Sequence, residues 1–156
     1  MRYFDQGAKI LDVGAGSGTT GAYLEKRYGV EVRSYEVLPP GENKYATMHN
    51  QREMGAALRI FNGRRLPDEG DAAHDTVIFN AVLHHAAHNT FALLREAARI
   101  AKRYILLVED LELGDDSTFR NGTRASVSDR NRLHEPKGIF RTHGEWTILI
   151  ESRRVE

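Results

Sequence analysis

The stretch from Ile10 to Gly21 reads Ile-Leu-Asp-Val-Gly-Ala-Gly-Ser-Gly-Thr-Thr-Gly and joins an apolar run to a cluster of glycines. The apolar run Lys9–Val13 is short and ends at a glycine, which predicts a buried strand. Glycine permits tight turns with unusual backbone angles, and it lets a ligand approach the main chain closely. This order of elements therefore predicts a ligand site at the carboxyl end of the strand.

Short apolar runs alternate with helix-like segments along the rest of the chain. The predicted strands are Lys9–Val13, 30–37, 58–61, 75–80 and 104–108. The predicted helices are Thr19–Tyr28, 43–57 and a helix from Asn89 or Thr90 through Ala101. Such alternation implies right-handed crossovers and a parallel sheet. The fold class is therefore α/β, with a Rossmann-like, doubly wound, mostly parallel sheet. The strand 104–108 is the most apolar of the five and suits a central position.

Length and composition restrict the function classes. A chain of 156 residues is expected to form one domain, over residues 1–156. Basic and acidic residues number 22 each, and a net charge of zero disfavours nucleic acid as the main partner. The absence of cysteine excludes disulfides and thiolate metal sites. The chain shows no signal core and no apolar window near the ~20 residues of a membrane span, so we expect a cytoplasmic protein without a membrane partner.

Two glycine patterns overlap after the first strand. Gly14, Gly16 and Gly18 form G-x-G-x-G directly at the strand end. Gly16, Gly18 and Gly21 also fit the dinucleotide pattern G-x-G-x-x-G, and Glu36 comes about 20 residues later, where an acid binds ribose hydroxyls. The same residues are therefore compatible with a nicotinamide-dependent oxidoreductase.

The position of Asp12 separates the two interpretations. In a dinucleotide site the helix N-terminus faces a pyrophosphate, and the carboxylate of Asp12 would lie close to that anion. Gly14 and Ala15 also intervene between the strand and Gly16. An amino-acid tail with an ammonium group tolerates the carboxylate better, so the pattern favours a ligand of that kind over a dinucleotide.

Several segments resemble the class I S-adenosylmethionine-dependent methyltransferases, in the expected order. The segment from Asp12 to Gly18 resembles the first motif of that family, and Glu36 stands where its ribose-binding acid ends the second strand. The similar segments further along are Phe-Asn-Gly-Arg-Arg-Leu-Pro at 61–67, Asp-Thr-Val-Ile-Phe-Asn-Ala-Val-Leu-His-His at 75–85 and His-Glu-Pro-Lys-Gly-Ile-Phe-Arg-Thr-His-Gly-Glu-Trp at 134–146. The resemblance implies methyl transfer from S-adenosylmethionine to a small-molecule acceptor.

The resemblance also assigns roles to residues of this chain. The glycines would bring the backbone against the methionine part of the cofactor, and Glu36 would hold its ribose. Val37 would pack on the adenine, and Asn62 with Gly63 would contact the adenine edge. Asn62 replaces the aspartate usual in the family. The implied cofactor-binding residues are Asp12, Gly14, Ala15, Gly16, Gly18, Glu36, Val37, Asn62, Gly63 and Asn80.

The chain also departs from the family pattern at its ends. Extra helices usually precede the glycine turn, and two more strands usually close the sheet. We therefore expect a fold truncated at both ends. This keeps open a non-catalytic subunit or scaffold that is completed by a homo- or hetero-oligomeric partner. The weakly patterned region 110–141 predicts a long loop, and 142–156 fits either a helix or a strand.

His84, His85 and His88 form the run H-H-x-x-H. We expect them in the loop before the helix, where this spacing defines no zinc site, and we predict no metal. The resemblance suggests a structural hydrogen bond for His85. It also suggests that His84 faces the substrate, where a histidine can act as a base near neutral pH. The alternative for both histidines is a packing role within the loop.

Other candidates carry less weight. His134 is a weaker candidate for a substrate contact. A basic group offers a weak nucleic-acid surface; its members are Arg120, Arg124, Arg130, Arg132, Lys137 and Arg141. The chain lacks the Asn/Asp-Pro-Pro-aromatic motif after the fourth strand, which disfavours amino methylation of nucleobases. Without cysteine, the covalent route to carbon-5 of pyrimidines is excluded.

Overall fold

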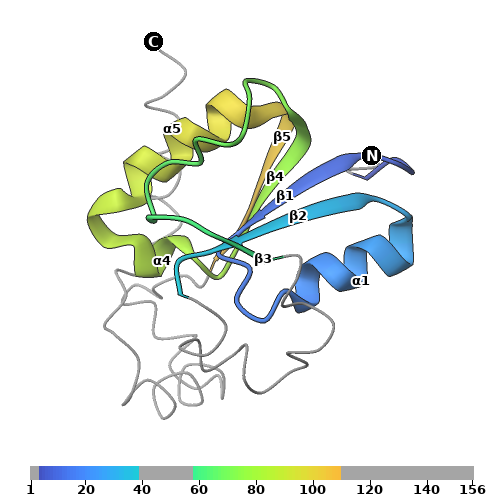
Figure 1. Ribbon diagram of the computed structural model, residues 1–156, viewed down its shortest axis with the longest axis horizontal. Helices are drawn as coiled ribbons and strands as arrows, with labels where there is room; N and C mark the ends of the chain where they lie inside the picture. The colour runs from blue at the N-terminus through green and yellow to red at the C-terminus, as the bar shows by residue number, and fades with distance from the viewer. Residues whose placement is uncertain (1–3, 39–57, 110–156) are drawn as a thin grey trace, which may run out of the picture.

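The computed structural model describes residues 4–38 and 58–109, drawn in colour in Figure 1. Within them lie five strands, β1 (Lys9–Val13), β2 (Glu31–Glu36), β3 (Leu58–Ile60), β4 (His74–Asn80) and β5 (Ala101–Val108). The helices are α1 (Thr19–Tyr28), α4 (Leu83–Ala86), the 3₁₀ turn η1 (Ala87–Asn89) and α5 (Thr90–Ile100). All neighbouring strands are parallel, in the order β3-β2-β1-β4-β5. The predicted α/β fold class is confirmed.

The sheet is covered on both faces, which is why its central strands β1 and β4 are mostly buried. Four consecutive residues of β1, from Ile10 to Val13, are buried. Leu11 and Val13 face a cluster shared with α5, whereas Ile10 faces one shared with Leu24 of α1. Figure 1 shows α1 and α5 on opposite sides of the sheet.

The expected central position of 104–108 is wrong for the sheet of described strands, where β5 is an edge strand. The central strands are β1 and β4, and the side chain of Val108 in β5 is 50% exposed. Apolar content therefore did not identify the central strands of the sheet.

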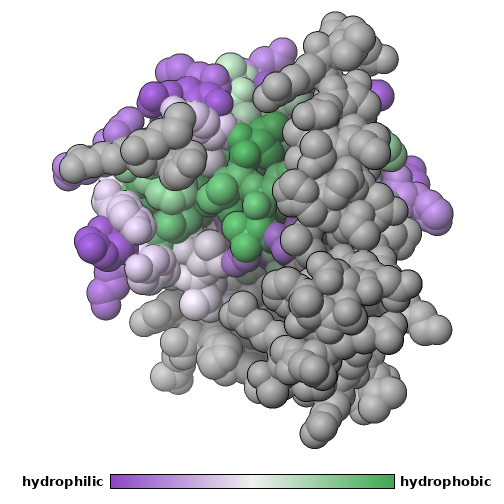
Figure 2. Space-filling model, turned by 180° about the vertical axis from the view of Figure 1, so that it is seen from behind, coloured by the Kyte–Doolittle hydropathy of each residue, from purple (hydrophilic) through white to green (hydrophobic). Residues whose placement is uncertain are grey.

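Figure 2 shows hydrophobic residues gathered in one area of the surface on the side opposite to the view of Figure 1.

The helix boundaries have local causes. Gly18 and Gly29 flank α1 with φ angles of 71° and 65°, in the left-handed region that glycine adopts at low cost. Asn89 and Thr90 are the two predicted cap residues of the next helix, and α5 begins at Thr90 with Asn89 at the cap position. Asn89 occupies the cap position without capping through its side chain, because its Oδ1 accepts from Nε of Arg64 at 2.8 Å.

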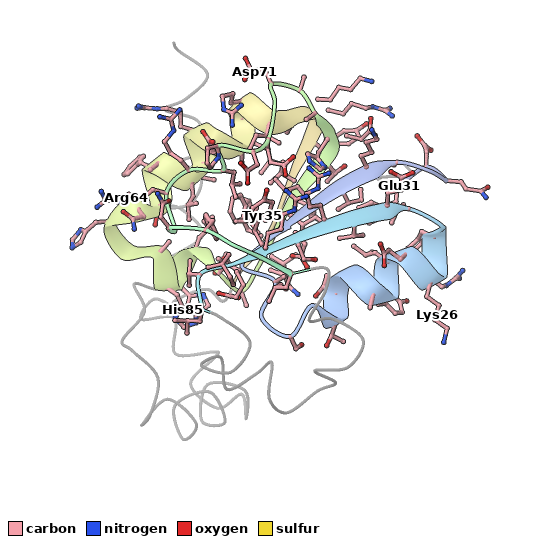
Figure 3. All side chains as sticks on the ribbon, in the orientation of Figure 1. Lys26, Glu31, Tyr35, Arg64, Asp71 and His85 are labelled. Atoms are coloured by element: carbon pink, nitrogen blue, oxygen red, sulfur yellow. The ribbon has the colours of Figure 1, made fainter. Side chains whose placement is uncertain are left out.

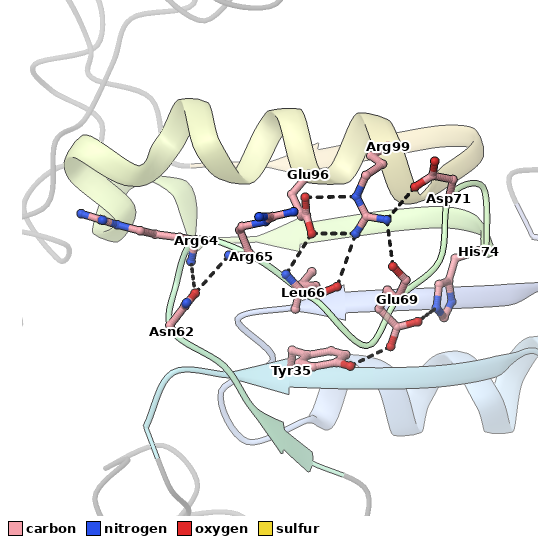
Figure 4. Close-up of polar contacts among 10 residues, drawn as sticks. All are labelled: Tyr35, Asn62, Arg64, Arg65, Leu66, Glu69, Asp71, His74, Glu96 and Arg99. Carbon is pink, nitrogen blue, oxygen red and sulfur yellow. Dashed lines mark hydrogen bonds and ion pairs between the residues drawn. The ribbon is translucent and has the colours of Figure 1, made fainter.

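The connection from β3 to β4 is fixed by a polar network centred on the buried side chain of Glu69 (Figure 4). The Glu69 carboxylate contacts Nη1 of Arg33 at 2.8 Å, the Tyr35 hydroxyl at 2.7 Å and Nε2 of His74 at 2.7 Å. Nη1 of Arg99 donates to the Glu69 carbonyl at 2.8 Å. Glu69 thus joins the connection to β2 and β4 through its carboxylate and to α5 through its carbonyl. The sequence did not suggest this role.

Several predictions fall outside the described residues: the helix 43–57, the loop 110–141 within the single domain 1–156, and the closing element 142–156. Truncation at the two ends stays a prediction as well. Among the described helices, none has the length and apolar character needed to cross a bilayer.

Candidate functional site

The site lies where β1, β2 and β4 end side by side. Val13 pairs with Tyr35 and with Phe79, so the residues just beyond these three strands meet at one edge of the sheet. Ligands of open α/β sheets bind at this carboxyl edge. The structure therefore brings together the glycine turn, the end of β2 at Glu36 and the end of β4 at Asn80.

The glycines of the turn serve different purposes. Gly14 has a φ of 75°, and a Cβ there would lie 2.6 Å from both γ-carbons of Val82, so packing itself excludes a side chain. Gly16 has a φ of 58°, yet a Cβ there would meet no atom of the described residues within 4 Å. Among the residues that the structure describes, Gly16 thus faces open space, where a ligand can approach the backbone.

Four amides of the turn are used inside the protein. Gly14 and Ala15 both donate to the carbonyl of Tyr35, at 2.8 and 2.9 Å. Gly16 donates to Oε2 of Glu36 at 2.8 Å, and Gly18 donates to the carbonyl of Ala15 at 2.7 Å. A pyrophosphate site needs such amides free to face the anion. The local geometry is therefore poorly suited to a dinucleotide.

Two buried acids give the site its electrostatic character. Asp12 is 1% exposed and Glu36 is 7% exposed. Among the described residues, Oδ2 of Asp12 has no hydrogen-bond partner, and no ion pair includes either acid. Burial, and next the charge of Glu36, raise the pKa of Asp12 to about 7. Such a pair favours a ligand that carries positive charge.

Glu36 orders the turn through hydrogen bonds to two backbone amides. Its Oε1 accepts from the amide of Val37 at 2.6 Å, and its Oε2 accepts from Gly16. Each carboxylate oxygen has two lone pairs, so Glu36 keeps acceptor capacity for ribose hydroxyls. The geometry thus leaves room for the predicted ribose contact.

The residues expected to border the adenine fall into two groups. Val37 and Gly63 are available to a ligand, whereas Asn62 shapes its own loop. Val37 is 46% exposed, and a Cβ on Gly63 would lie 3.4 Å from its Cγ1, so these two residues are neighbours. The side chain of Asn62 is turned to its own loop, where Oδ1 accepts from the amides of Arg64 at 2.9 Å and Arg65 at 3.0 Å (Figure 4). This is an Asx-type turn, in which the amide oxygen replaces a backbone acceptor.

Asn80 is exposed at the end of β4, and its Nδ2 donates to Oγ1 of Thr20 in α1 at 3.1 Å. The next residue, Ala81, has a φ of 56°, which is uncommon for a residue with a Cβ. Its amide donates to the carbonyl of Val108 at 2.7 Å. The chain thus turns sharply after β4 and leaves Asn80 beside the first turn of α1.

The histidines lie in α4 and η1, and the expectation of a loop is corrected. His84 is 4% exposed, and its Nδ1 lies 2.7 Å from Oε2 of Glu109. Oε1 of Glu109 accepts from the amides of Val82 at 2.8 Å and Leu83 at 2.6 Å. The structural hydrogen bond expected of His85 is therefore made by His84.

His85 is the exposed member of the pair, and its ring centroid lies 3.9 Å from that of His84. Partial burial and the neighbouring His84 lower the pKa of His85, and the charges of Glu109 and Glu36 oppose this shift. Figure 3 shows His85 at the same end of the sheet as the ends of β2 and β4. The histidine available to an acceptor at this edge is thus His85.

Sequence reasoning missed Glu109. It comes directly after β5 just as Glu36 ends β2, and an acid at the carboxyl end of a parallel strand was the signal that could have identified it. Within residues 4–38 and 58–109, no three His, Asp or Glu side chains are grouped so that they could hold a metal ion. His134, the basic group from Arg120 to Arg141 and the segment 134–146 lie outside the described residues.

Known proteins match the chain in sequence and in fold. A family model described as a methyltransferase domain matches residues 11–107. The sarcosine/dimethylglycine N-methyltransferase of Aphanothece halophytica is 26% identical over 104 residues, which are 65% of this chain and 37% of that protein. The chain thus spans less than half the length of this relative.

Two solved structures show the fold. One is the methyltransferase-like partner of the Haloferax volcanii Trm112 methyltransferase activator, in their complex, with a TM-score of 0.67 and 19% identity over 96% of this chain and 62% of that one. The other is a SAM-dependent methyltransferase from Aquifex aeolicus, with a TM-score of 0.63 and 18% identity over 96% of this chain and 72% of that one.

The matched region 11–107 contains the glycine turn, both buried acids and the exit of β4. The methyl donor S-adenosylmethionine is thereby favoured over the dinucleotide, and the two acids beside open space at Gly16 fit its positive charge. The chain belongs to the methyltransferase domain family, within the class I S-adenosylmethionine-dependent methyltransferases.

Proposed function

We propose that this chain transfers a methyl group from S-adenosylmethionine to the amine of a small amino acid such as sarcosine or dimethylglycine. The observation that carries cofactor use is the pair of buried acids, Asp12 and Glu36, beside the open face of Gly16. The relative that acts on sarcosine and dimethylglycine, by its name, supports the class of acceptor.

The chemistry requires little of the protein beyond alignment. The sulfonium of the cofactor supplies an activated methyl group. The protein holds donor and acceptor in line, and this arrangement removes much of the entropic barrier. Glu36 binds the ribose, Val37 and Gly63 border the adenine, and Asn80 lies beside the donor end. Asn62 acts indirectly, because its side-chain oxygen shapes the loop that presents Gly63.

His85 is the proposed contact for the acceptor. An attacking amine must be deprotonated, and a neutral imidazole can accept that proton. The lowered pKa of His85 keeps its ring neutral near pH 7. His84 is a positioning residue in this scheme, because Glu109 holds its ring and that ring packs at a tilt of 48° against the ring of His85. The base expected at His84 is therefore assigned to His85 instead.

The test is to incubate the purified chain with methyl-labelled cofactor and either sarcosine or dimethylglycine, and to detect labelled product by mass spectrometry. We expect label in the acceptor, and an His85→Asn variant that binds cofactor normally but turns over more slowly below pH 8. Glu31→Gln, at the opposite end of β2, is the control. A chain that binds cofactor but methylates neither acceptor would contradict the proposed substrate class.

The second candidate is a subunit that needs a partner for turnover. It is favoured by the likeness to a protein solved together with a methyltransferase activator. Efficient turnover by the lone chain would exclude it. Organisation as one domain and a cytoplasmic location remain predictions; limited proteolysis and cell fractionation test them.

A further inference from the structure

Near Asp12, the negative charge of the acidic side chains is not balanced by positive charge. Asp12 lies opposite Ser34 of β2 and Ile78 of β4, neither of which carries a charge. Its Oδ2 is buried and has no hydrogen-bond partner among the described residues. The nearby charged group is Glu36, two residues beyond Ser34 on the same face of β2.

The charges on the other elements around Asp12 lie elsewhere. The charged residues of α1 lie in the second half of the helix: Glu25, Lys26 and Arg27. Those of β4 and β5 lie near the opposite end of the sheet: Asp75, Lys102 and Arg103. Asp75 is also occupied, since its Oδ2 accepts from the amide of Lys9 at 2.9 Å. The other titratable group that feels the charge of Glu36 is His85, whose pKa is lowered. Among the described residues, the charge of Glu36 therefore acts on Asp12 without a permanent local cation.

Burial disfavours the charged form of Asp12, and the neighbouring charge of Glu36 disfavours it further. Glu36 is fixed by the amides of Gly16 and Val37, both of which donate to it. Asp12 lacks such donors at Oδ2, and it is therefore the acid that holds a proton. The raised pKa of Asp12, about 7, agrees with this assignment.

We propose that binding of the positively charged cofactor drives this proton off Asp12 and into solvent, so that Asp12 couples cofactor loading to pH. The inference rests on the cofactor of the proposed function, and it identifies Asp12 as the residue that selects for ligand charge. The charge balances: the neutral acid becomes a carboxylate beside one positive group of the ligand, and the released proton goes to the buffer. That group is either the ammonium or the sulfonium.

The sign of the pH dependence is set by the linkage between protonation and binding. The ligand prefers the ionised acid, so affinity is low when Asp12 is protonated and rises with pH until Asp12 ionises by itself. For a group with a pKa of about 7, affinity should increase about ten-fold from pH 6 to pH 8. About half a proton should be released per ligand at pH 7 and almost none at pH 8.5.

The experiment is calorimetric titration of the whole chain with S-adenosylmethionine and with S-adenosylhomocysteine, in buffers of different ionisation enthalpy at pH 6, 7 and 8.5. Asp12→Asn and the exposed Asp68→Asn are measured in parallel, and thermal melting confirms that both fold. We expect proton release by the native chain and by Asp68→Asn, and its loss in Asp12→Asn. The ammonium of the free ligand is the same in all three titrations, so a difference among the proteins reports on the site.

The two ligands identify the charge that Asp12 senses. Release with both supports the ammonium, and release with S-adenosylmethionine alone supports the sulfonium. Binding without buffer-dependent heat, or with equal proton release in Asp12→Asn, would overturn this inference and leave methyl transfer untouched. No binding of either ligand to the folded chain would overturn both. A carbon-13 titration of the ligand-free chain is independent: an aspartate carboxyl titrating near pH 7 supports the inference, and ordinary values for all aspartates refute it.

Discussion

At the scale of single residues, acids at or near the ends of parallel strands organise the site. Asp12 in β1, Glu36 at the end of β2 and Glu109 after β5 are spaced along one edge of the sheet. Glu36 and Glu109 each accept two backbone amides, whereas Oδ2 of Asp12 has no partner among the described residues. Buried carboxylates with donors order the backbone around them, and one without a donor remains sensitive to ligand charge.

The cofactor contact of Glu36 can be measured directly. Glu36→Ala removes the proposed ribose acceptor and should weaken S-adenosylhomocysteine binding by about 1–3 kcal/mol, because the ribose hydroxyls lose a charged partner. Calorimetric titration measures this, and Glu31→Ala at the exposed start of β2 is the matched control. An unchanged dissociation constant would place the ribose elsewhere.

The two adjacent histidines should differ in their effect on stability. His84→Ala leaves the buried Glu109 carboxylate without one partner, and we expect a loss of about 1–3 kcal/mol in the free energy of unfolding. His85→Ala, at an exposed position, should change it by less than about 0.5 kcal/mol. Urea unfolding followed by circular dichroism compares the variants, and equal losses would contradict the assignment.

At the scale of elements, the turn between β1 and α1 depends on the connection from β4 to α4. Gly14 packs against Val82, which lies just before α4, and the Ala81 amide fixes that connection to the end of β5. The glycine turn is therefore held by the neighbouring connection as well as by its own backbone angles.

This dependence predicts a compensating pair. Gly14→Ala places a methyl group 2.6 Å from the Val82 γ-carbons and should destabilise the chain by about 2–4 kcal/mol, from overpacking and left-handed strain together. Adding Val82→Ala removes both γ-carbons, leaves the Cβ of residue 82 at 3.2 Å and should restore about 1–2 kcal/mol, while the strain remains. Thermal melting of both single variants and the double variant measures the coupling. Strict additivity would show that the contact carries no energy.

Gly16→Ala provides the contrast within the same turn. Open space around Gly16 means that only backbone strain, about 1–2 kcal/mol, should reduce stability. The added methyl group projects into the proposed ligand space, so S-adenosylhomocysteine affinity should fall more than ten-fold. Stability and affinity are measured on one sample, and unchanged affinity would contradict a ligand at Gly16.

At the scale of the whole molecule, Glu69 joins three elements at the side of the sheet covered by α5. Burial raises the pKa of this carboxyl, but hydrogen bonds from Arg33, His74 and Tyr35 outweigh burial and hold the pKa below its ordinary value. A lowered folded-state pKa means that the stabilisation is complete above the unfolded value of about 4.5 and is lost as the pH falls further.

Glu69→Gln should therefore destabilise the chain by about 1–3 kcal/mol at pH 7, because the buried donors lose their charged acceptor. The difference from the native chain should shrink below about pH 4.5, where the native carboxyl becomes protonated. Urea unfolding between pH 3 and 7 measures both effects, and the exposed Asp68→Asn is the control. A difference independent of pH would contradict an ionised Glu69 in this network.

The sequence by itself determined the five described strands, the helices α1 and α5, the parallel sheet and the glycine turn. These features arise from local pattern: apolar runs of strand length, and glycines where the backbone takes positive φ. Only the tertiary structure decided which histidine is buried, which amides of the turn are already used, and that β5 lies at the edge of the described sheet. Those outcomes depend on partners distant in sequence, such as Glu109 for His84 and Glu36 for Asp12. Local pattern encodes backbone preference, whereas burial and charge depend on which strands fold side by side.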